Sequence, residues 1–236
     1  MVADAVVYHP SLAHLLRFFD TTIGRDKLMR LVQYFARFYA AFLIRSADAG
    51  KIKDADKWRS LMSLFSTSRK IIRVGKPLQH LKAAATAYDN KTADAFLRYA
   101  AVGRQLCYAA YLTFDTAILA HSTKLITLRN PQLTQKLYYR LWLAGITFSV
   151  ASGVYKHVGL NQREAVLSNA AEKDIVAVKK VRAEKKKTST QFALDVLDST
   201  IPISGLALLP IDDGTVGLAG MLSSVIGAAE QWKVTA

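Results

Sequence analysis

Residues 69–85, RKIIRVGKPLQHLKAAA, combine apolar residues at helical spacing with a group of cations. The apolar members, which repeat on one helix face, are Ile71, Val74, Leu78, Leu81 and Ala85. The accompanying cations, most of them on the opposite face, are Arg69, Lys70, Arg73 and Lys76. Such a helix suits a bilayer interface, with its apolar stripe under the headgroups and its cations among lipid phosphates. An ordinary helix, packed on a protein core with a solvated basic face, has the same pattern.

Gly75 and Pro77 interrupt this stretch. Proline lacks an amide hydrogen and disfavours the α conformation at the preceding residue, so the helix must kink or break there.

The composition favours a membrane partner. The 236 residues carry a formal net charge of +14, which implies an anionic partner. The mean hydropathy of +0.14 is high for a nucleic-acid binder with so many cations. A soluble helical nucleic-acid binder would also leave the apolar stretch 214–229 without a role. We therefore expect an anionic phospholipid membrane and no nucleic acid as the partner.

The fold class expected is all-α, because the chain shows no strand-like alternation of useful length. Helices are expected over about 9–20, 25–49 and 54–88, with Gly50 as the C-cap of the second. We distinguish a basic amphipathic region (1–98), a hydrophobic helical pair (99–160), a basic helical tether (161–200) and a glycine-rich C-terminal helix (201–236).

Three apolar stretches stand out, at 105–123, 141–155 and 214–229. They are either membrane-embedded helices, of which we expect one to three, or buried core helices, because none is a clean span by length and charge. The last stretch carries a row of small residues typical of a helix that another helix approaches closely. These are Gly214, Gly217, Gly220, Ser223, Ser224, Gly227 and Ala228.

No pattern of catalytic or metal-binding chemistry is present. The five histidines are scattered, and Cys107 is the single cysteine. Asp212 and Asp213, the adjacent acid pair, are more typical of a solvated turn than of a catalytic dyad. We expect no enzyme, no metal and no cofactor.

Several segments together resemble the peroxin-eleven family of peroxisomal membrane proteins, in its fungal type. They are GRDKLMRLVQY (24–34) followed by Arg37, SRKIIRVGK (68–76), Tyr108 with Tyr111, Leu112 and Asp115, KLYYRLW (136–142), and the glycine-rich C-terminal stretch. Their order and spacing cover nearly the whole chain.

The resemblance implies a peroxisomal membrane protein, integral or tightly associated, that promotes elongation, tubulation and division of the organelle. It also implies self-association into homo-oligomers and engagement of a dynamin-related GTPase with its fission adaptor. In this interpretation Ile71, Val74, Leu78 and Leu81 insert into one leaflet, and Arg69, Lys70, Arg73 and Lys76 bind anionic lipid. The alternative is a peroxisomal pore for small metabolites, with Arg104, Asp115 and Arg140 along a water path.

Overall fold

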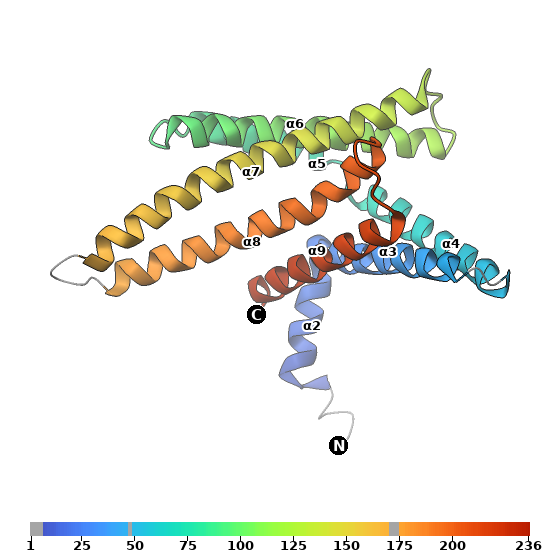
Figure 1. The fold of residues 1–236 in the computed structure, drawn as a ribbon, viewed down its shortest axis with the longest axis horizontal. Helices are drawn as coiled ribbons and strands as arrows, with labels where there is room; N and C mark the ends of the chain where they lie inside the picture. Colours follow the sequence, from blue (N-terminus) through green and yellow to red (C-terminus); the bar gives the residue numbers. More distant parts are fainter. Residues whose placement is uncertain (1–6, 47–48, 170–174) are drawn as a thin grey trace. The chain divides into compact units, whose positions relative to one another are not determined.

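The computed structural model describes residues 7–46, 49–169 and 175–236, and every regular element within them is an α-helix (Figure 1). The all-α prediction is confirmed. The chain forms two compact units. Unit 1 consists of residues 1–74 and 207–236, and unit 2 of residues 75–206. The four regions distinguished above follow composition, whereas contacts join the two ends of the chain in unit 1.

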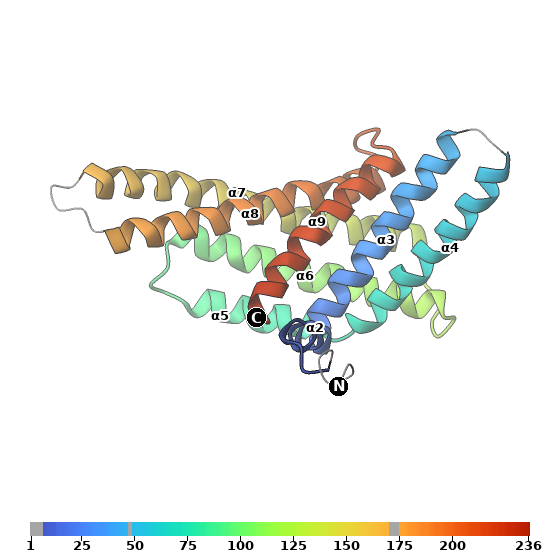
Figure 2. The same ribbon diagram turned by 90° about the horizontal axis from the view of Figure 1, so that it is seen from below.

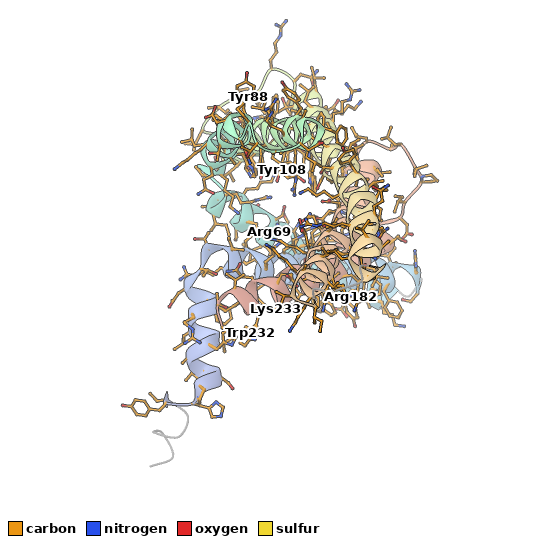
Figure 3. All side chains as sticks on the ribbon, turned by 90° about the vertical axis from the view of Figure 1, so that its left-hand side faces the viewer. Arg69, Tyr88, Tyr108, Arg182, Trp232 and Lys233 are labelled. Atoms are coloured by element: carbon orange, nitrogen blue, oxygen red, sulfur yellow. The ribbon has the colours of Figure 1, made fainter. Side chains whose placement is uncertain are left out.

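Unit 1 is built around one central helix. Its helices are α2 (Pro10–Asp20), α3 (Thr22–Arg45), α4 (Ala49–Ile72) and α9 (Asp213–Val234). Helix α3 packs against both α4 and α9 (Figure 2). Between α3 and α4, a small cluster of Ala40, Leu43 and Ala55 is covered by aromatic side chains, among them Trp58. Near the C-terminal end of α9, the Trp232 ring (labelled in Figure 3) lies against the His14 ring of α2, tilted by 34° and with ring centroids 3.7 Å apart.

Small residues allow α9 to approach α3 closely, as the sequence predicted. A Cβ atom added to Gly217 would collide with the backbone of Phe38, and one added to Gly220 would collide with the ring of Tyr34. Ser223 and Ser224 on the same helix are buried, and Ser224 Oγ donates a hydrogen bond to the Gly220 carbonyl. The predicted close approach is therefore confirmed, and its partner is α3.

Two ion pairs fix the start of α9 to α3. Arg37 and Arg45 bind Asp213 and Asp212 at 2.5 Å and 2.7 Å. Asp212 is also the N-cap of α9, because its Oδ1 accepts hydrogen bonds from the amides of Gly214 and Thr215. Hydrogen bonds from Thr215, with smaller effects of the Gly214 amide and Arg45, lower the pKa of Asp212 to about 2.

One expected helix boundary is wrong. Helix α3 ends at Arg45 with Ser46 as its C-cap, and Gly50 lies in the first turn of α4. The Ser46 hydroxyl donates a hydrogen bond to the Leu43 carbonyl at 2.6 Å. A serine, and not the expected glycine, therefore caps the C-terminus of α3.

In the described residues of unit 2, four helices pack in chain order. They are α5 (Lys76–Asp89), α6 (Ala95–Ser122), α7 (Pro131–Asn169) and α8 (Ile175–Gly205). Helix α6 contacts α5 and α7, and α7 and α8 run side by side as a long hairpin (Figures 1 and 2). Inside this hairpin, Ser149 donates to Asp195 at 2.6 Å. Burial raises the pKa of Asp195, although hydrogen bonds from Ser149 and Gln191 oppose the shift.

The three apolar stretches lie in α6, α7 and α9. Across the described residues, no helix combines the length and the hydropathy needed to cross a membrane.

Candidate membrane-binding surface

The break expected near Gly75 and Pro77 separates two helices. Helix α4 ends at Ile72 and α5 begins at Lys76. Gly75 has a φ of 87°, a left-handed conformation that glycine adopts without the steric penalty of a side chain. Pro77 lies in the first turn of α5, where its missing amide hydrogen costs no hydrogen bond.

Because of this break, the predicted stripe does not lie on one helix. Ile71 lies in the last turn of α4 and Val74 in the link, both in unit 1, whereas Leu78 and Leu81 lie on α5 in unit 2. All four side chains are exposed. Only the last two therefore belong to one continuous helix face.

The outward face of α5 is apolar. Leu78, Leu81, Ala85 and Tyr88 follow the spacing i, i+3, i+7 and i+10, and all are exposed. Leu78 exposes 71% of its area and Leu81 47%. We call this row the α5 stripe. Tyr88, labelled in Figure 3, stands at the C-terminal end of the stripe, where the Lys91 ammonium lies 4.0 Å from its ring centroid.

The opposite face of α5 is held by α6. Ala84 is buried, and the His80 imidazole donates from Nδ1 to Gln105 Oε1 at 2.6 Å. The His80 ring also meets Tyr108 edge-on, with ring centroids 5.6 Å apart. The protein thus holds α5 through its mixed face, and leaves Leu78 and Leu81 exposed to solvent.

Arg69 lies inside unit 1, although its sequence pattern predicted a lipid-binding cation. Its side chain is only 7% exposed, and its Nε donates to Asp26 at 3.0 Å. A second hydrogen bond runs from Nη1 to Gln33 Oε1 at 2.7 Å. Burial lowers the pKa of Arg69, and the charge of Asp26 opposes this shift. Arg69 therefore joins α4 to α3.

The other three predicted cations, Lys70, Arg73 and Lys76, are half-buried near the break. Arg73 donates from Nε to the Arg69 carbonyl at 3.0 Å. The exposed cations beside the α5 stripe are instead Lys82, within α5, and Lys91, just after it.

Tyr88, Lys82 and Lys91 were not among the site residues predicted from the sequence. The signal for Tyr88 was present, because it continues the helical repeat of Leu78 and Leu81 by two further steps.

The residues considered for a pore lie in different surroundings. Arg104 lies 5.2 Å from the Tyr108 ring centroid, Asp115 is buried, and Arg140 is exposed. Two cavities of unit 2 are lined by other residues.

Known proteins similar to this chain all belong to one group. The family model for peroxisomal biogenesis factor 11 (PEX11) matches residues 12–232. Peroxisomal membrane protein PMP27 of Saccharomyces cerevisiae is 32% identical over 248 aligned residues, which cover the whole of both chains. PMP30A of Candida boidinii is 30% identical, with 100% of this chain and 99% of its own covered. Peroxisomal biogenesis factor 11 of Schizosaccharomyces pombe is 24% identical, with 97% and 98% covered. No solved structure matches the chain.

The helical architecture and these full-length similarities define a protein of the peroxisomal membrane. The chain belongs to the peroxisomal biogenesis factor 11 family, as its sequence motifs predicted. Its role lies in peroxisome biogenesis, because the family is one of peroxisomal biogenesis factors.

Proposed function

We propose that the protein remodels the peroxisomal membrane by inserting the α5 stripe into one leaflet. The observation that carries this proposal is the exposure of Leu78, Leu81 and Tyr88 on a helix whose other face is fixed to α6. A contiguous exposed apolar surface with cations beside it is typical of a membrane-binding helix.

Shallow insertion bends a bilayer because it expands one leaflet relative to the other. Leucine side chains enter the boundary between headgroups and acyl chains, and Tyr88 suits the same depth, since its ring is apolar and its hydroxyl polar. Lys82 lies one residue beyond Leu81, so its stem can lie along the membrane while its ammonium reaches lipid phosphates. Each such cation contributes about 1 kcal/mol near an anionic surface.

The proposal changes the set of residues expected from sequence. Arg69 is removed from the lipid-binding group because its guanidinium pairs with Asp26 inside unit 1. Ile71 and Val74 stay in the proposal as exposed apolar residues of unit 1, with Lys70, Arg73 and Lys76 as half-buried cations around the break.

The test is electron microscopy of the full chain mixed with phosphatidylcholine vesicles, with and without phosphatidylserine. We expect tubules on the anionic vesicles only, and none with the double variant Leu78→Glu, Leu81→Glu. The control is Leu64→Glu, because Leu64 is also well exposed, at 62%, but belongs to α4 of unit 1 and is not part of the stripe. Equal tubulation by the double variant and by the control would refute the proposal.

Self-association, and recruitment of a dynamin-related GTPase with its fission adaptor, stay predictions from the family resemblance. The apolar side chains Leu218, Leu222 and Val225, which are exposed on α9, offer a surface on which self-association is testable.

A further inference from the structure

A second apolar site lies in the α7–α8 hairpin. A cavity of about 330 Å³ opens between the two helices of unit 2. Its lining residues are Gly153, Val154, His157 and Val158 of α7 and Thr188, Ser189 and Phe192 of α8. We call this cavity the hairpin groove. Val154, Val158 and Phe192 are exposed, so the groove presents an apolar surface at a place that no residue of the α5 stripe reaches.

One residue of the groove wall, Gly153, has no side chain. A Cβ atom added to Gly153 would meet no other atom within 4 Å, so the space beside this glycine is open. Mid-helix glycine costs stability relative to alanine, and here it leaves the cavity wide.

The two ends of the groove differ in charge. The groove lies between two contacts that join α7 to α8. At one end Glu164 pairs with Arg182 and Lys185, and at the other Ser149 donates a hydrogen bond to Asp195. At the first end, Arg182 Nε and Lys185 Nζ lie 2.7 Å and 3.1 Å from the two oxygens of Glu164. Both cations lower the pKa of Glu164, which is therefore ionised at neutral pH.

Two cations that share one carboxylate leave an excess positive charge at this end. Arg182 is 67% exposed, and its guanidinium has donors beyond the one directed at Glu164 (Figure 3). Lys186 and Lys187, which directly follow Lys185 in α8, are also exposed. Guanidinium groups pair well with phosphate oxygens, since their donors form a planar fork.

We propose that the hairpin groove binds one membrane phospholipid with an anionic headgroup. An acyl chain lies against Val154, Val158 and Phe192, and the phosphate lies at Arg182 and Lys185. His157, Thr188 and Ser189 supply polar contacts along the groove, as in ligand sites that combine an apolar wall with a few polar groups. This binding does not depend on insertion of the α5 stripe, because the two sites share no residue.

The experiment uses the full chain in phosphatidylcholine vesicles that contain a small fraction of phosphatidic acid with a diazirine in its acyl chain. After illumination, mass spectrometry locates the lipid-labelled peptides. We expect labelling of the α7 and α8 segments that line the groove. Labelling spread evenly over all exposed apolar helices would overturn the proposal.

A matched pair of glycine variants tests the cavity itself. Gly153→Leu fills the groove, so labelling there should fall about tenfold or more, as expected when an acyl chain must overpack the site. The control is Gly159→Leu, because an added Cβ there also meets no other atom within 4 Å, and Gly159 lines a neighbouring cavity that shares Val154 and Val158 with the groove but includes no residue of α8. Both variants replace a mid-helix glycine by a better helix former, and helical content and melting temperature establish that they fold. Unchanged labelling in a folded Gly153→Leu would disprove the site.

A second pair of variants tests the headgroup. Arg182→Gln should reduce labelling by the phosphatidic acid probe severalfold and leave labelling by a phosphatidylcholine probe unchanged. Lys233→Gln is the control, since Lys233 is similarly exposed, at 66%, and also pairs with a glutamate, but belongs to α9 (Figure 3). Competition by oleate but not by unlabelled phosphatidic acid would show a free fatty acid as the occupant and overturn the assignment to a phospholipid.

Discussion

Replacing both leucines of the α5 stripe by glutamine should weaken binding to anionic vesicles by about fifty-fold. Leu78 and Leu81 expose 71% and 47% of their areas, together a little more than one whole leucine. Complete burial of one leucine side chain is worth about 2 kcal/mol, so insertion of these exposed parts contributes about 2.4 kcal/mol, or about fifty-fold in the binding constant. Glutamine keeps the helix propensity high, so α5 itself should persist.

The assay is flotation of the full chain with phosphatidylserine-containing vesicles over a range of lipid concentrations. Leu64→Gln removes from α4 a leucine whose exposure, 62%, lies between those of Leu78 and Leu81, and should stay within about twofold of the parent, as is usual for surface substitutions. The reasoning would be refuted if the double variant bound within twofold of the parent, or if Leu64→Gln lost as much affinity.

Three further predictions concern stability. Arg69→Met removes the guanidinium that pairs with the buried carboxylate of Asp26 and should lower the free energy of unfolding by about 3 kcal/mol or more, measured in urea, whereas the exposed Lys57→Gln should change it by less than about 0.5 kcal/mol. Gly217→Leu places a side chain against the α3 backbone and should cost about 3 kcal/mol in the same measurement; an unchanged midpoint would contradict the close packing of α9. The pKa of Asp212 is depressed to about 2, so its contribution to stability is complete above the unfolded-state pKa near 4 and disappears as the pH falls toward 2. Asp212→Asn keeps an N-cap residue and should make the melting temperature depend less on pH between about pH 4 and pH 2. If the melting temperature of the variant fell with pH as steeply as that of the parent, Asp212 would not be the group responsible.

The sequence predicted the helices well because their signals are local. Spacing of apolar residues located α3 and α4, a continuous apolar stretch located most of α6, and Gly75 with Pro77 located the break before α5. The C-terminal cap of α3 was misplaced because Gly50 is a good cap residue only where a helix actually ends. The structure uses Ser46 instead, whose hydroxyl bonds the Leu43 carbonyl.

The pairings between distant segments could not be predicted in the same way. Arg69 and Asp26 are 43 residues apart, and no periodic pattern relates them. A sequence pattern does not distinguish an exposed arginine from one that is buried in an ion pair. Arg69 was therefore predicted to bind lipid together with Lys70, Arg73 and Lys76. The small residues of α9 indicated that another helix comes close, but nothing local identified α3, whose contacting residues Tyr34 and Phe38 lie far away in the chain.

How α5 is held also determines what it can do at a membrane. A free helix of this length is marginally stable in water and would have to fold on the bilayer, at a cost in conformational entropy. In unit 2, the His80–Gln105 hydrogen bond and the packing of Ala84 hold α5 as a helix before any lipid is present. The whole inserted area then contributes to binding, because no ordering cost is subtracted from it. Since α6 covers the mixed face, the proposed mechanism has the α5 stripe as the apolar surface of α5 that meets lipid, with insertion to the depth of Leu78, Leu81 and Tyr88. A shallow helix that is held rigidly by its bundle expands the headgroup region of one leaflet and leaves the other unchanged, which is the geometry that bends a membrane.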